Sequence, residues 1–97
     1  MTTICNAFSL QMMKEFPATI TIEEIAEPSK EELSKMDSAV GHADTAAVLG
    51  VPFVRKNVQL EKGDVVVVAQ LTGGRLPEGS RTLPEGFAFK WLKVTIG

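Results

Sequence analysis

Two apolar segments that flank a glycine-rich stretch constrain the fold of this chain more than any other feature. The first, Val65 to Leu71, contains four consecutive valines, and the second, Phe87 to Ile96, places Phe87, Phe89 and Trp91 on alternate positions. The fifteen residues between them, TGGRLPEGSRTLPEG, hold four glycines and two prolines, too many for a regular element. We therefore predict a central strand buried on both faces, a long mobile loop of the kind that often carries function, and a second strand.

Hydrophobic periodicity and helix-start signals predict the other elements. Ser29 followed three residues later by Glu32 has the spacing of a capping box, and Gly50 supplies a helix stop. In chain order we expect a strand Thr2 to Phe8, a helical turn Gln11 to Lys14, a strand Ala18 to Ile25, a helix Lys30 to Met36, a helix Ala43 to Leu49, and a strand Asn57 to Leu60 that forms a hairpin with Val65 to Leu71. The sum is a single α+β domain over residues 1–97, with a mixed, mostly antiparallel sheet flanked by short helices.

Size and charge bound the possible partners. A chain of 97 residues builds one core, and a domain this small gains stability from a partner subunit, so its size favours dimerisation. Hydrophobic residues make up 44% of the chain and charged residues 23%, as in ordinary globular proteins. The formal net charge of −2 argues against a protein that coats DNA or long RNA, while one or two local cations still suffice for a small anionic ligand.

Cysteine usage and hydropathy predict the compartment. Cys5 is the single cysteine, so no intramolecular disulfide can form, and we interpret it as a small buried hydrophobe. No signal peptide and no apolar segment of about 18 residues occurs. We expect a cytoplasmic protein that does not span a membrane.

The common cofactor and metal motifs are absent. One histidine and one cysteine cannot assemble a His/Cys zinc site, and the acidic residues lack the spacing of a carboxylate site. No phosphate-binding P-loop, dinucleotide fingerprint or nucleophile elbow occurs. We therefore predict neither a metal nor a cofactor.

Three pieces of sequence remain as candidates for a site. Asn6 and Ser9 lie at the end of the first strand, Gly41-His42 opens a helix, and Arg75 and Glu78 lie in the glycine-rich loop. Taken singly, each has a structural interpretation. The first pair would form a turn, the histidine would cap its helix, and the last pair would be a solvated ion pair.

Taken together and in order, these pieces resemble a known family. The motifs are NAFS followed by MM, then SAVGH with Thr45-Ala46 three residues on, then QL, then GRLPEG. They are similar to those of the viral and prophage ring nucleases that act as anti-CRISPR proteins against type III systems. The resemblance implies an α+β homodimer that binds cyclic tetra-adenylate and cuts it to short linear products without a metal.

The resemblance also assigns roles to residues. The catalytic histidine of the family matches His42, and its arginine and glutamate pair matches Arg75 and Glu78. Ligand-binding roles fall on Asn6, Ser9, Gly41 and Thr45. The doubled glycine Gly73-Gly74 and the second LPEG depart from the family pattern, and Arg81 competes with Arg75 for its role.

The implied chemistry suits these residue types. A cyclic oligoadenylate carries its own nucleophile, the ribose 2′-hydroxyl, so the protein need only align, neutralise and protonate. An arginine and the free N–H groups of the helix after Gly41 can neutralise the phosphoryl oxygens. Histidine, with an unperturbed pKa of about 6.5, can protonate the leaving 5′-oxygen. Glu78 either orients Arg75 or assists deprotonation of the 2′-hydroxyl.

Two other functions remain open at this stage. The chain could sequester cyclic oligoadenylate through Asn6, Ser9 and Arg75 without cutting it. It could also be a small viral module that binds DNA or protein, although its acidic balance weighs against DNA.

Overall fold

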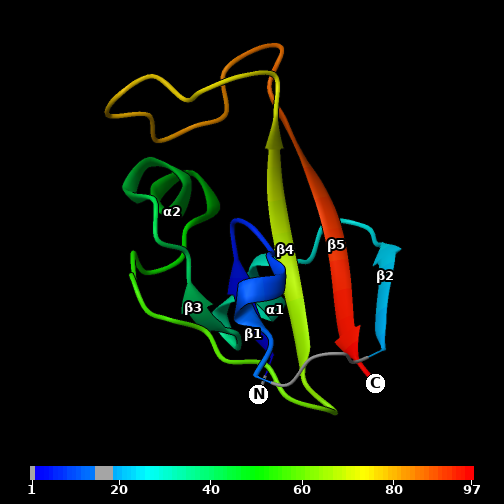
Figure 1. Ribbon diagram of the computed structural model, residues 1–97. Coiled ribbons are helices and arrows are strands. Elements are labelled where there is room, and N and C mark those ends of the chain that lie inside the picture. The colour runs from blue at the N-terminus through cyan, green and yellow to red at the C-terminus, as the bar shows by residue number, and fades with distance from the viewer. Residues whose placement is uncertain (1, 15–18) are drawn as a thin grey trace.

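One five-stranded sheet, in the order β2-β5-β4-β1-β3, forms the centre of the computed structural model, which describes residues 2–14 and 19–97 (Figure 1). The long strands β2, β5 and β4 pair antiparallel, whereas the short β1 is parallel to both β4 and β3. The elements are β1 (Thr3–Cys5), the 3-10 helix η1 (Leu10–Met12), β2 (Ile20–Glu24), α1 (Lys30–Ser34), β3 (Asp37–Ala39), α2 (Ala43–Leu49), β4 (Val65–Thr72) and β5 (Ala88–Ile96). The predicted α+β class with a mixed, mostly antiparallel sheet is confirmed.

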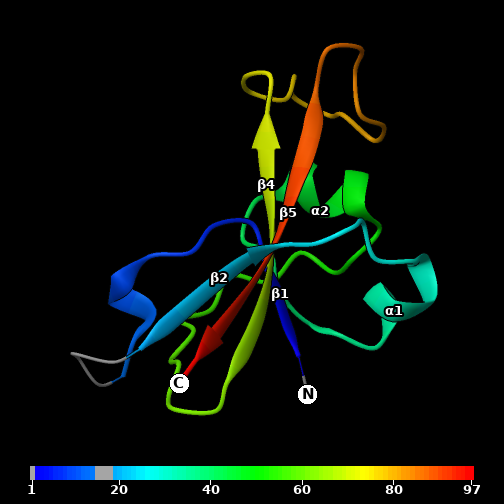
Figure 2. The same ribbon diagram turned by 90° about the vertical axis from the view of Figure 1, so that its right-hand side faces the viewer.

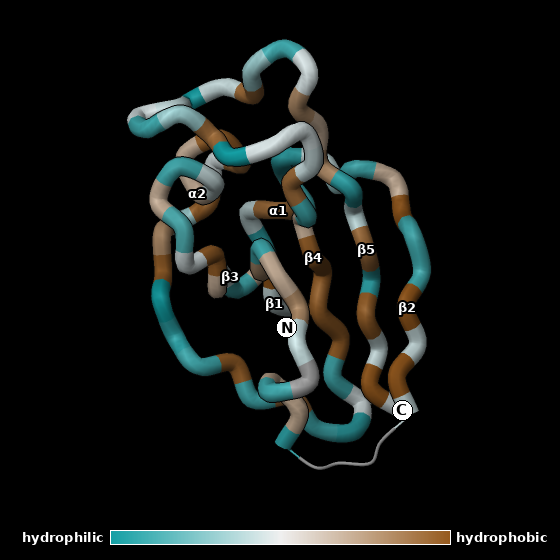
Figure 3. The backbone as a smooth tube through the Cα atoms, turned by 45° about the horizontal axis from the view of Figure 1, so that its top comes forward, coloured by the Kyte–Doolittle hydropathy of each residue, from teal (hydrophilic) through white to brown (hydrophobic). Residues whose placement is uncertain are grey.

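Strand β4 is buried on both faces, as its run of valines predicts. Val66 and Val68 pack into one apolar cluster, while Val67 and Ala69 pack into the other, and none of the four is more than 5% exposed. Because successive side chains of a strand point to opposite faces, a continuous apolar run supplies both clusters. Figure 3 shows this hydrophobic stretch of β4 in the middle of the sheet.

Each cluster is covered by a different part of the chain. Leu33 of α1 and Ala46 of α2 complete one cluster, and Met13 and Leu60 complete the other. Figure 2 shows the two helices on one side of the sheet and η1 on the other. Both faces of the central strands are therefore shielded.

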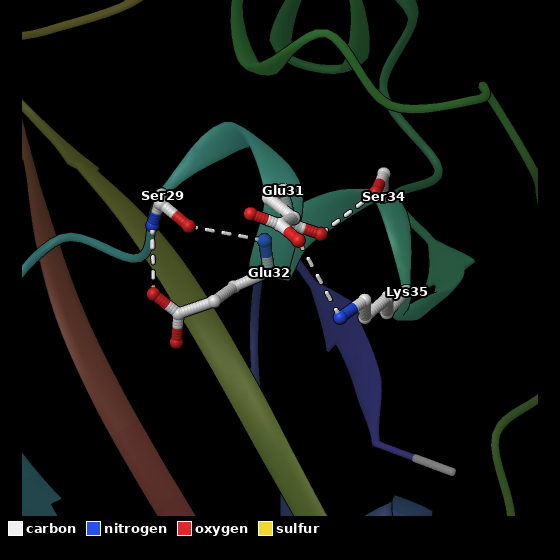
Figure 4. Close-up of polar contacts among 5 residues, drawn as sticks. All are labelled: Ser29, Glu31, Glu32, Ser34 and Lys35. Carbon is white, nitrogen blue, oxygen red and sulfur yellow. Dashed lines mark hydrogen bonds and ion pairs between the residues drawn. The ribbon is translucent and has the colours of Figure 1, made fainter.

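Helix α1 begins at the predicted capping box (Figure 4). The Ser29 hydroxyl accepts from the Glu32 amide, the Glu32 carboxylate accepts from the Ser29 amide, and both distances are 3.1 Å. The helix ends at Ser34 rather than Met36, because the amides of Lys35 and Met36 bond three residues back instead of four. The start of the helix is confirmed and its predicted end is two residues too long.

The predicted hairpin of Asn57 to Leu60 with the central strand is wrong. Leu60 instead forms an isolated parallel bridge with Met13, in which its amide donates to the Met12 carbonyl and its carbonyl accepts from the Lys14 amide. Phe53 forms a second isolated parallel bridge, with Val40, and residues 54–59 have no strand structure. The apolar alternation of this segment is too short to fix a strand partner by itself.

The other differences concern strand ends. The first strand stops at Cys5 instead of Phe8, and β3 (Asp37–Ala39) was not expected. In the edge strand β2, Ile20 packs against the core but Ile22 is 55% exposed, so the predicted half-buried face holds for one isoleucine only. Ala18, the first residue of that predicted strand, lies outside the described residues.

Candidate functional site

The carboxyl ends of β1 and β3 lie side by side at one edge of the sheet. Their parallel register pairs Cys5 with Ala39, so the chain leaves both strands at the same level. Just beyond this level the side-chain oxygen Oδ1 of Asn6 accepts a hydrogen bond from the Gly41 amide at 3.3 Å. This bond takes Asn6 out of the strand and joins the two chain segments. Crevices beyond the carboxyl ends of parallel strands are common ligand sites.

His42 follows Gly41 and caps helix α2. Its backbone is extended, with φ −124° and ψ 119°, and its ring nitrogen Nδ1 accepts from the Thr45 amide at 3.3 Å. The structural interpretation of His42 as a helix cap is therefore confirmed. Since Nδ1 acts as the acceptor, the neutral ring carries its proton on Nε2 and can donate from there. This hydrogen bond also occupies the Thr45 amide, one of the first-turn N–H groups that were expected to bind the ligand.

Thr45 supports the same ring with its side chain. Its hydroxyl Oγ1 lies 3.2 Å from Nδ1 of His42, and the residue is 5% exposed. Nδ1 thus faces two groups of Thr45, the amide and the hydroxyl. The ring is held in orientation by backbone and side chain of one residue.

The glycine-rich loop reaches this edge because β4 and β5 extend past the ends of the parallel strands. Figure 1 shows the loop above α2 at the tip of this hairpin. Gly73 turns the chain with φ +103°, and a Cβ there would lie 2.5 Å from the carbonyl oxygen of Gly86. Leu76, only 5% exposed, fixes the first half of the loop in an apolar position. Gly73 therefore has a steric role, which explains one half of the doubled glycine.

A cavity of about 310 Å³ lies where these segments meet. Its polar lining comes from Asn6, His42, Thr45 and Arg75, and the rest from Ala69, Leu71, Gly74 and Leu76. Three segments that are far apart in the sequence thus contribute to one cavity. Its donors are an imidazole N–H, a guanidinium and a carboxamide, which suit an anion with hydroxyl groups nearby.

The other predicted residues lie at different distances from this cavity. Ser9 lines a neighbouring hollow of about 350 Å³ that shares Asn6 with the cavity. Glu78 is exposed on the loop and does not line the cavity, and among the ion pairs of the described residues none joins it to Arg75. Arg81 lines a separate groove beside α1 and α2. Arg75 is thus the loop arginine beside His42.

Arg55 is a basic residue at this edge that the sequence analysis missed. Its Nε donates to the Gly41 carbonyl at 3.1 Å, and its guanidinium lies 5.5 Å from the centre of the Phe53 ring. Together with Lys56 and Asn6 it lines a hollow of about 500 Å³. The only sequence signal for Arg55 is that it forms a basic pair with Lys56. Such a pair by itself is more often part of a solvated surface than of a binding site.

Two further properties of the described residues bear on function. Over residues 2–14 and 19–97, no three His, Cys, Asp or Glu side chains come close enough together to hold a metal ion. In the same part of the chain no helix has the length and hydropathy to cross a membrane.

Comparison with known proteins finds a matching family and matching solved structures. A family model described as STIV B116-like matches residues 2–87. Among solved structures, B116 of Sulfolobus turreted icosahedral virus superposes with a TM-score of 0.74 and 25% sequence identity, covering 97% of each chain. No curated protein sequence matches this chain.

Proposed function

The chain belongs to the STIV B116-like family, and from this premise and the cavity at the sheet edge we propose that it is a metal-independent ring nuclease. Its substrate would be cyclic tetra-adenylate, and its products linear di-adenylates with 2′,3′-cyclic phosphate ends. Such an activity would remove the messenger of type III CRISPR defence, so the protein would act as an anti-CRISPR. The namesake of the family is a viral protein, which is compatible with that role.

One observation carries the proposal. Asn6, His42, Thr45 and Arg75, which come from three separate motifs, line the same cavity. A solvated loop arginine or a purely structural cap would have no reason to converge with an amide side chain on one cavity. The convergence supplies a proton donor for the leaving oxygen, a cation for the phosphoryl oxygens and a hydrogen-bonding amide for the ribose or base, all of which a metal-free transesterification can use.

The reaction is an intramolecular transesterification. The ribose 2′-oxygen attacks the adjacent phosphorus, a 2′-O–P bond forms, the P–O5′ bond breaks, and a water molecule takes the 2′-hydroxyl proton. The departing 5′-oxygen takes a proton from His42, which must first hold protons on both ring nitrogens. Arg75 would neutralise the charge that builds on the phosphoryl oxygens.

Alignment falls to the residues at the strand ends. Because Oδ1 of Asn6 is occupied by the Gly41 amide, its NH₂ group is the one free to donate to a ribose or base. Ser9 would contact a part of the ligand that extends into the neighbouring hollow. Two cuts open a cyclic tetranucleotide into two halves, so a two-fold homodimer that repeats the same contacts suits the ligand.

The test is a cleavage assay with purified protein, cyclic tetra-adenylate and excess EDTA. We expect linear di-adenylate from the wild type and intact substrate from His42→Ala. Unchanged substrate with the wild type, or cleavage only after a divalent metal is added, would overturn the proposal. Sedimentation of the protein with and without the ligand would test the homodimer.

A binding protein without catalysis is the second candidate, and the exposed position of Glu78 favours it. A carboxylate that does not line the cavity is poorly placed to remove the 2′-hydroxyl proton. In that case the wild type and His42→Ala would lower the free messenger concentration equally, by stoichiometric binding. Catalytic turnover by a substoichiometric amount of wild type would exclude this candidate.

A further inference from the structure

The glycine-rich loop is attached to helix α2 by a hydrogen bond. The Gly79 amide donates to Oδ1 of Asp44 at 3.1 Å. Other hydrogen bonds of the loop close the turn from Pro77 to Ser80 or join its two ends to the start of β5, as the bond from the Thr72 hydroxyl to the Ala88 carbonyl does. Leu76 is the buried apolar anchor of the same loop. The first half of the loop is thus held at two points.

These two anchors are neighbours of the two charged residues assigned to the reaction. Arg75 precedes Leu76, and Glu78 precedes Gly79. Asp44 lies two residues after His42, in the first turn of the helix that the histidine caps. The bond from Asp44 therefore fixes the turn that carries Glu78 relative to the ring of His42.

We propose that Asp44 is a positioning residue for this site, which holds the loop that carries Arg75 against the start of helix α2. The inference rests on the proposed ring-nuclease function. Asp44 does not line the cavity and acts through the Gly79 amide. Without this bond Leu76 alone would retain the loop, and the guanidinium of Arg75 would spend less time at the cavity.

The Asp44 carboxylate also has a second role, and the experiment must distinguish its effect from that of the hydrogen bond to Gly79. An acidic residue in the first turn also stabilises a helix through its dipole. Asp44→Asn removes the charge and keeps a carbonyl oxygen that can accept from Gly79, whereas Asp44→Ala removes both. Asp64→Ala is a matched control, because Oδ2 of Asp64 also accepts from a backbone amide, that of Glu61, at the opposite end of the molecule.

The experiment measures kcat and KM for cyclic tetra-adenylate in EDTA, together with the amide resonance and exchange rate of Gly79. A positioning error of about 1 Å costs about 10²-fold in rate, so we expect kcat to fall about 10- to 100-fold in Asp44→Ala with KM little changed. Asp44→Asn and Asp64→Ala should stay close to the wild type. Gly79 should exchange faster in Asp44→Ala alone.

A double-mutant cycle with Arg75→Ala distinguishes positioning from a general loss of stability. If Asp44 acts through the loop that carries Arg75, Asp44→Ala should matter much less once Arg75 is gone. If the two substitutions act independently, the losses in kcat of the single variants will multiply in the double variant to within about twofold. That result would overturn the proposal. So would unchanged kinetics in Asp44→Ala, or equal damage from Asp44→Asn. A wild type that cleaves nothing would overturn the proposed function instead, and the Gly79 amide would still decide whether Asp44 fixes the turn.

Discussion

Replacing His42 by alanine and by asparagine separates its role as a helix cap from its proposed role as an acid. Nδ1 of His42 accepts from the amide at the third helical position, Thr45, at 3.3 Å. Alanine loses this acceptor, and loss of such a cap costs about 1 kcal/mol. In a domain of this size that lowers the melting temperature by about 4–8 °C. Asparagine is among the best capping residues and should restore most of the loss.

Cleavage should respond differently to the same two variants. Asparagine cannot protonate the leaving 5′-oxygen, and removal of a general acid costs about 10²–10⁴-fold in rate. We therefore expect both variants to lose activity to this extent, while only the alanine variant loses stability. Urea unfolding gives the free energy of unfolding, and single-turnover cleavage of cyclic tetra-adenylate gives the rate.

Two results would refute this reasoning. An asparagine variant that cleaves at the wild-type rate would show that His42 is not the acid, whatever its cap contributes. An alanine variant as stable as the wild type would show that the bond to the Thr45 amide has no energetic weight. In the cleavage assay the asparagine variant is the control for the alanine variant. In the unfolding experiment the wild type is the control.

Three further predictions concern the loop and the core. Gly73→Ala should lower the free energy of unfolding, measured in urea, by about 1–3 kcal/mol more than Gly63→Ala. Both glycines have φ near +100°, but a Cβ meets backbone atoms at Gly73 and open space at Gly63. Equal losses of stability in the two variants would refute the clash. Arg75→Ala should lower kcat by about 10²–10³-fold, while Arg81→Ala, which alters a separate groove, should leave it unchanged; the reverse order would refute the assignment. Burial raises the pKa of the Cys5 thiol from 9.0 to about 11, against a smaller opposing hydrogen bond from the Ala7 backbone. The unfolded thiol ionises first, so stability should fall as pH rises from about 9 to about 11, by at most about 3 kcal/mol, and Cys5→Ala measured over the same pH range should lack this component.

The parts of the fold that the sequence predicted are those whose signals are local. The capping box at Ser29, the start of a helix after His42 and the doubly buried valines of β4 each depend on residues within one turn or one strand. Strand β3 escaped prediction because three residues carry no period, and its existence depends on pairing with β1. The segment Asn57 to Leu60 was misassigned for the same reason, since its one bridge is to Met13 far away in the chain.

The candidate site was predictable in its residue types and not in its geometry. No local signal says that Asn6 meets Gly41, because that contact follows from the register of two parallel strands. Arg55 was missed because its partner is a backbone carbonyl, which leaves no pattern of side chains to detect. The position of Glu78 outside the cavity depends on how the loop folds back on α2, and a glycine-rich segment encodes that weakly.

The cap and the acid make opposite demands on the same nitrogen, and Thr45 is placed to reconcile them. As a cap, Nδ1 must be unprotonated to accept from the Thr45 amide, whereas the doubly protonated ring that the reaction requires carries a hydrogen there. The Thr45 hydroxyl lies 3.2 Å from Nδ1 and can donate to the neutral ring or accept from the protonated one. With a hydrogen on Nδ1, the hydrogen bond from the Thr45 amide would therefore be replaced by one from Nδ1 to the Thr45 hydroxyl. The buried hydroxyl can therefore hold the ring in the same orientation in both roles.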